Sequence, residues 1–108
     1  MAPIEIVAMA VAKPGKADRL QEVLEASAQW VRRTEPGALR YLIQRQVNAK
    51  DQPTFVVLET YEDQAALEFH AKSESVVETR RLLESEDLLS EPLKIMLTKD
   101  VGGYASKL

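Results

Sequence analysis

The sequence predicts one domain of the α+β class. Four segments show the two-residue alternation of apolar and polar side chains that is typical of strands. Other segments show the apolar spacing of amphipathic helices, and a short loop of turn residues joins the second and third strands as a hairpin. The 108 residues suffice for one packed core and are too few for two.

The first strand is predicted over Ile4 to Ala12, where both side-chain parities are apolar. Pro14-Gly15 breaks it, and apolar residues then recur at helical spacing from Ala17 to about Thr34. Glu35-Pro36-Gly37 ends this helix, because proline cannot extend it and glycine takes the turn. The apolar stripe of the helix consists of Leu20, Val23, Leu24, Ser27, Trp30 and Val31.

The middle of the chain predicts the hairpin. Its strands run from Leu39 to Val47 and from Thr54 to Tyr61, and residues 48–53 form the loop between them. Asp63 then caps a short helix that extends to His70 or Ala71.

The second half continues with broken helical structure. A helix is expected from about Ser73 to Leu83, and Ser85 to Leu89 is expected to form one more helical turn. Pro92 to Lys99 closes the pattern as a fourth strand. The order is therefore β-α-β-β-α-β, which is the ferredoxin-like arrangement of an antiparallel sheet with helices on one face.

This arrangement has a consequence for assembly. The first and third strands are apolar on both faces, but the helices cover only one of them. We therefore expect a homodimer in which two sheets pack face to face. The folded domain is predicted over residues 1–100, and residues 101–108 form a flexible tail.

Composition excludes several classes of function. The net charge is −3 and no basic stripe is present, so no nucleic-acid partner is expected. Without cysteine there is no thiolate catalyst, and a single histidine excludes a site of several histidines within one subunit. No cofactor is predicted.

The location of the protein is predicted from its ends. No secretory signal and no membrane-spanning segment is recognisable, so an intracellular protein with no membrane partner is expected. Ser106-Lys107-Leu108 matches the peroxisomal address that an import receptor reads at a free carboxyl terminus. A chance occurrence in a bacterial, cytoplasmic protein is the alternative.

Several short motifs, in order, carry a family resemblance. They are Pro14-Gly15-Lys16, the run from Glu35 to Tyr41, the strand from Phe55 to Tyr61, and Ala66-Leu67 with His70. Over residues 4–99 the chain resembles the antibiotic biosynthesis monooxygenase (ABM) family, which includes quinol monooxygenases. The resemblance implies a dimeric α/β barrel that oxidises a phenolic, quinol or anthrone-like small molecule with O2 and without metal or flavin.

Two other functions occur on the same barrel and stay open. One is a non-catalytic small-molecule-binding or stress-response protein, and the other is a heme-binding or heme-degrading protein. Some monooxygenases of the family use an Asn and a Trp on the third strand, where this chain offers Val57 and Tyr61. The sequence therefore departs from the family at the two residues on which that version of the mechanism depends.

His70 is the first candidate for a catalytic role, since imidazole is the side chain that exchanges protons near neutral pH. The alternative is a histidine that binds a carbonyl at the helix end and is stabilised by the helix dipole. Glu59 and Tyr61 are predicted in support, as a carboxylate that orients His70 and as a hydroxyl donor to the substrate. For Glu59 the alternative is an ion pair with Arg40 or Lys94.

An aromatic pocket is predicted around this histidine. The candidates for binding the substrate are Trp30, Tyr41, Phe55, Phe69 and Met96. Each of them is alternatively an ordinary core residue.

Overall fold

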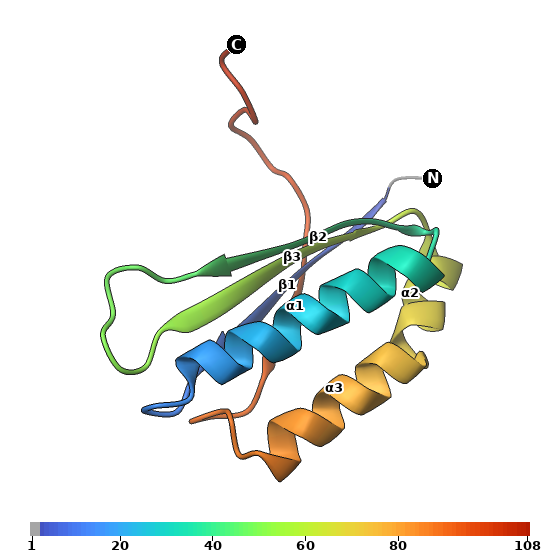
Figure 1. Cartoon of the computed structure of the whole chain (residues 1–108). Helices are drawn as coiled ribbons and strands as arrows, with labels where there is room; N and C mark the ends of the chain where they lie inside the picture. The colour runs from blue at the N-terminus through green and yellow to red at the C-terminus, as the bar shows by residue number, and fades with distance from the viewer. Residues whose placement is uncertain (1–2) are drawn as a thin grey trace.

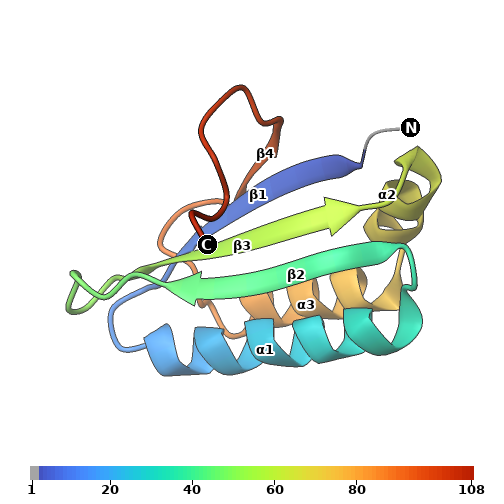
Figure 2. The ribbon, with the colours of Figure 1, turned by 90° about the horizontal axis from the view of Figure 1, so that it is seen from above.

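The structure is a computed structural model that describes residues 3–108. Its elements in chain order are β1 (Ile4–Val11), α1 (Ala17–Thr34), β2 (Ala38–Arg45), β3 (Thr54–Tyr61), α2 (Gln64–Ala71), α3 (Glu74–Ser85) and β4 (Lys94–Thr98). The four strands form one antiparallel sheet in the order β2-β3-β1-β4. The predicted α+β class and the ferredoxin-like arrangement are confirmed, and α1 and α3 lie side by side on one face of the sheet (Figures 1 and 2).

The core lies between this sheet face and the helices. Alternate residues of β3, beginning with Phe55, are buried, and so are the even-numbered positions of β1 from Ile6 onward. The helix α1 buries the predicted stripe against them except for Trp30, which is half-buried, and Leu20 is fully enclosed. The alternate residues of the strands and the apolar stripe of α1 therefore pack together in one apolar layer.

The opposite face of the sheet carries its own apolar row. Leu58 of β3 pairs with Leu42 of β2 and with Val7 of β1, and Val7 in turn pairs with Met96 of β4. Among the described residues no helix lies on this face of the sheet (Figure 1), and Leu42 is 47% exposed. The open face that the sequence predicted is present.

One local prediction is wrong. Ser85 to Leu89 does not form a further helical turn, because α3 ends at Ser85 and Asp87 adopts a positive φ of 54°. Aspartate tolerates this left-handed backbone, which reverses the chain after the helix. Leu88 is thereby fully buried, and Leu89 pairs with Ala12 in an isolated bridge.

Residues 99–108 form neither helix nor strand and extend away from the helices (Figure 1). Val101 and Tyr104 are 88% and 77% exposed. The peroxisomal role of Ser106, Lys107 and Leu108 stays a prediction. Within residues 3–108, no helix combines the length and the apolar character needed to cross a bilayer.

Candidate functional site

The centre of the candidate site is His70, in the last turn of α2. The helix starts at Asp63, whose carboxylate accepts a hydrogen bond from the backbone N–H of Ala66 at 2.8 Å. Gly37 lets this helix approach the turn before β2, because a Cβ on Gly37 would lie 2.6 Å from the Cβ of Ala66. The side chain of His70 is thereby brought under the sheet, where it is 11% exposed.

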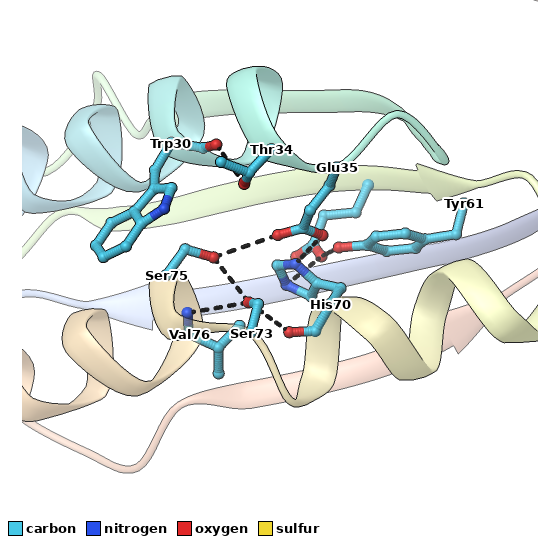
Figure 3. Close-up of polar contacts among 9 residues, drawn as sticks. Trp30, Thr34, Glu35, Tyr61, His70, Ser73, Ser75 and Val76 are labelled. Atoms are coloured by element: carbon cyan, nitrogen blue, oxygen red, sulfur yellow. Dashed lines mark hydrogen bonds and ion pairs between the residues drawn. The ribbon is translucent and has the colours of Figure 1, made fainter.

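Glu35 is the main partner of His70. It follows α1 directly, and its carboxylate oxygen Oε1 lies 2.8 Å from Nδ1 of His70. The side chain of Glu35 is only 3% exposed. Figure 3 shows the imidazole ring beside this carboxylate, with the hydroxyl of Tyr61 pointing toward both from the right. His70 therefore binds a buried carboxylate and not a backbone carbonyl.

Glu59 and Tyr61 come from the helix-facing side of β3. The hydroxyl of Tyr61 donates a hydrogen bond of 2.5 Å to Oε1 of Glu59, and the same oxygen lies 3.8 Å from Nε2 of His70. The ring centroids of Tyr61 and His70 are 5.1 Å apart. Glu59 thus lies near the histidine as predicted, and it forms no ion pair with Arg40 or Lys94 among the described contacts.

Tyr41 completes this side of the site. It pairs with Glu59 across β2 and β3, and its ring centroid lies 5.9 Å from that of His70. Burial, reinforced by the charge of Glu59, raises the pKa of Tyr41 to about 12 and also raises the pKa of Tyr61. Both phenols are therefore protonated at neutral pH and act as hydrogen-bond donors.

The carboxyl group of Glu59 is shifted toward its neutral form. Burial raises its pKa, and the hydrogen bond from Tyr61 and the nearby His70 act in the opposite direction. Burial is the larger effect because it removes water from a charged group. A carboxyl group with a raised pKa beside an imidazole is an arrangement that can exchange protons.

Two serines continue the network on the far side of Glu35. The hydroxyl of Ser75 donates to Oε2 of Glu35 at 3.3 Å and also lies 2.8 Å from the hydroxyl of Ser73. Ser73 in turn donates to the backbone carbonyl of His70 at 2.7 Å and caps α3 (Figure 3). Among residues 3–108, every side-chain nitrogen or oxygen that is fully shielded from solvent has a hydrogen-bond partner.

The other predicted binding residues do not gather at His70. Phe55 is fully buried in the core, four positions along β3 from Glu59, which is about 13 Å of strand. Phe69 is 53% exposed on the outer side of α2, and Met96 pairs with Val7 in the open-face row. Trp30 lies on α1 and lines a surface hollow that does not contain His70. The substrate-binding roles of these residues stay predictions.

The surface of the described residues includes two hollows near α1. One, of about 540 Å³, lies beside α1 and β2 and is lined by Glu22, Glu25, Ala26, Ala28, Gln29 and Ile43. The other, of about 310 Å³, is lined by Trp30, Lys72, Glu74, Val77 and Glu78. Neither contains His70 or Glu59. Within residues 3–108, no set of three or more histidine or acidic side chains is arranged to hold a metal ion.

Glu35 and Ser75 are the residues that sequence reasoning missed. The local sequence pattern marks Glu35 only as part of a helix-ending turn. One signal was available, because a carboxylate directly after a helix faces the negative end of the helix dipole and is disfavoured there. Such a residue needs a compensating partner, and the chain has only one histidine.

The comparisons with solved structures agree with this fold. A candidate antibiotic biosynthesis monooxygenase from Caulobacter crescentus CB15 is 24% identical, with a TM-score of 0.80 over 93% of this chain and 91% of that one. PA3566 from Pseudomonas aeruginosa is 28% identical, with a TM-score of 0.79 over 94% and 97% of the two chains. Rv0793 from Mycobacterium tuberculosis is 19% identical, with a TM-score of 0.76 over 96% and 100%. A comparison with curated proteins found no match.

The comparison with protein families agrees with the motifs of the sequence. The profile described as antibiotic biosynthesis monooxygenase matches residues 3–82, which includes the strands β1 to β3 and the residues Glu35, Glu59, Tyr61 and His70. The chain therefore belongs to the antibiotic biosynthesis monooxygenase family.

Proposed function

We propose that this protein is a cofactor-independent monooxygenase that oxidises a phenolic, quinol or anthrone-like molecule with O2. Family membership supports a monooxygenase-like protein that binds a small molecule. The observation that carries the finer proposal is the position of His70 between two buried carboxylates, 2.8 Å from Glu35 and 3.8 Å from Glu59.

The residues of the site fit the first step of such a reaction. The substrate hydroxyl, or an acidic C–H beside a carbonyl, gives its proton to His70, and the negative charges of Glu35 and Glu59 stabilise the resulting imidazolium. The phenol of Tyr41 lies beside the imidazole and serves as a donor to the substrate oxygen. The hydroxyl of Tyr61 donates to Glu59 and so holds that carboxylate beside His70.

The remaining steps use the substrate as the reductant. The substrate anion passes electrons to O2, and for an anthrone-like CH2 group one oxygen atom becomes the new carbonyl. The other oxygen atom leaves as water with the two hydrogens removed from that carbon. The proposal requires that the substrate displace water beside His70, which would protect the anion and the peroxide intermediate from side reactions.

The test measures O2 consumption with a panel of hydroquinones and anthrones in metal-free buffer. We expect His70→Ala to lower kcat by about 10²-fold or more, since general base catalysis contributes at least that much. Glu68→Ala, an exposed change on the same helix, is the matched control and should retain activity. Equal activity of His70→Ala and the wild type would remove His70 from the mechanism.

We also propose that the protein acts as a homodimer through the open face of the sheet. The apolar row of Leu42, Leu58, Val7 and Met96 crosses all four strands without cover from the described chain. A second copy offers the same row, so a two-fold arrangement buries both.

A non-catalytic binding protein is the second candidate. It is favoured by the finding that neither surface hollow contains His70 or Glu59. This alternative predicts that an aromatic ligand raises the melting temperature of the protein without O2 consumption. The same ligand panel, followed by thermal unfolding, separates the two functions.

A further inference from the structure

We propose that Glu35 is a positioning residue that keeps a proton on Nδ1 of His70, so that Nε2 is the atom that accepts a proton. The assignment of the proton to Nδ1 rests on the contacts of the site alone. Its consequence for turnover rests on the proposed function above.

The contacts of Glu35 define which ring nitrogen carries the proton. Oε2 of Glu35 accepts the hydroxyl of Ser75, and Oε1 lies 2.8 Å from Nδ1 of His70. An ionised carboxylate only accepts hydrogen bonds, so Nδ1 is the donor in this contact. The neutral ring is therefore the Nδ1–H tautomer, and the charged ring keeps the same hydrogen bond.

The other ring nitrogen has a different environment. Nε2 is 3.8 Å from Oε1 of Glu59, which is beyond hydrogen-bond distance, and that oxygen already accepts the hydroxyl of Tyr61. Nε2 has no hydrogen-bond partner among residues 3–108. The proton that His70 gains or loses is thus located on Nε2, on the side of Glu59, Tyr61 and Tyr41.

The position of Glu35 indicates that its contact with His70 has to offset the unfavourable free energy of a buried negative charge. The carboxylate is almost fully buried, and it follows α1, whose carboxyl end carries a partial negative charge. Ser75 supplies one neutral hydrogen bond at 3.3 Å, which is long for such a bond. The shorter contact with His70 is the stronger compensation, so the pair is expected to stay formed in the folded protein.

The test uses the fact that the chain has one histidine. Two-bond ¹H–¹⁵N spectra of the labelled protein report directly which ring nitrogen carries the proton. At a pH where the ring is neutral, we expect the proton on Nδ1 in the wild type. Glu35→Met keeps a side chain of similar length but removes the hydrogen-bond acceptor. In this variant we expect most of the proton population to move to Nε2. Glu84→Met, at an exposed position of α3, is the matched control and should leave the spectrum unchanged.

Two spectral results would overturn the proposal. The first is a wild-type spectrum in which Nδ1 of the neutral ring carries no proton. This measurement needs no variant, so it is informative even if Glu35→Met folds poorly. The second is a folded Glu35→Met protein with its proton still on Nδ1.

The kinetic part of the test separates this proposal from the proposed function. With an oxidisable substrate, Glu35→Met should lower kcat by about 10²-fold and change KM only a few-fold, since the loss is in proton transfer and not in binding. An unchanged kcat would overturn the positioning role. If the wild type oxidises nothing in the panel, the proposed function fails, and the spectra still decide where the proton lies.

Discussion

The side chains of the site form a buried polar chain in an otherwise apolar layer. Glu59 and Tyr61 occupy positions in β3 whose neighbours in the same row, Val57 and Phe55, belong to the core. Buried polar groups are tolerated where each finds a partner, and here the chain of contacts runs from Tyr61 through Glu59 and His70 to Glu35. Removal of Glu35 therefore leaves Nδ1 of His70 without its partner, and removal of the Tyr61 hydroxyl leaves Glu59 without its donor.

The hydroxyl of Tyr61 can be removed without changing the shape of the core. Tyr61→Phe leaves Glu59 buried without its donor, and we expect a loss of about 1–3 kcal/mol in the free energy of unfolding. Urea unfolding measures this loss. Tyr104→Phe, at a position that is 77% exposed, is the control and should change stability by less than about 0.5 kcal/mol. Equal stabilities of the two variants would show that the hydrogen bond to Glu59 contributes nothing net.

The raised pKa of Glu59 makes stability depend on pH. Burial raises this pKa above its ordinary value of 4.5, so the folded state holds the proton more tightly than the unfolded state does. The stability that Glu59 contributes is fully present below pH 4.5 and is lost as the pH rises through the raised value.

Glu59→Gln should therefore gain stability relative to the wild type as the pH is raised from 4.5 toward neutrality, because glutamine does not ionise. Urea unfolding of both proteins at a series of pH values measures the difference. Glu84→Gln, at an exposed site, is the control, and its free energy of unfolding should depend on pH as that of the wild type does. A difference that falls with rising pH would contradict the direction of the shift.

Among the helices and strands, the placement of α2 decides whether the site exists. His70 is at the end of this helix, Glu35 follows α1, and Glu59 lies on β3, so three elements have to meet. Gly37 holds α2 against the turn before β2. Its carbonyl accepts the backbone N–H of Glu62, and its missing side chain admits Ala66 of α2.

Gly37→Ala should push α2 away from the turn before β2. The added Cβ would lie 2.6 Å from the Cβ of Ala66, which is too close without movement of the helix. We expect a loss of about 1–3 kcal/mol in unfolding free energy, as for other overpacked positions. Gly102→Ala meets no atom within 4 Å and is the matched control. A stable Gly37→Ala protein with an unchanged histidine spectrum would contradict this account of how α2 is held.

The molecule as a whole has one covered and one uncovered sheet face. The covered face holds the core and the site, whereas the open face carries the apolar row. On one side of the row lie the polar residues Arg40, Thr60 and Glu5. On the other side Val56 and Met9 widen the apolar surface, and Gln44 and Lys94 lie at its edges. An apolar stripe with polar margins is typical of an interface between subunits.

Leu58→Glu tests the proposed dimer. It places an unpaired carboxylate in the middle of the apolar row, where burial against a second copy costs several kcal/mol. We expect sedimentation at micromolar concentration to show a dimer for the wild type and a monomer for this variant. Val47→Glu, at a loop position that is 96% exposed, should remain dimeric. A monomeric wild type would contradict the proposal directly.

The sequence predicted the fold well because the fold depends on periodicities that are local. Alternation in β1 and β3, and the apolar stripe of α1, are present in short windows of the chain and survive packing unchanged. The prediction was wrong for Ser85 to Leu89, which form a turn around Asp87 in place of a further helical turn. There the burial of Leu88 outweighs the helical preference of the segment.

The sequence by itself determined the order of the elements, the uncovered sheet face, and His70 with Glu59 and Tyr61 as candidates. The last two share a strand face and His70 follows at a short distance along the chain, so their proximity was accessible to local reasoning. Only the tertiary structure brought Glu35 to His70, because the two residues are 35 positions apart and meet when α1 and α2 pack against the same end of the sheet. It also separated Phe55, Phe69 and Met96 from the site, since their distances from His70 follow from strand length and helix rotation and not from residue type.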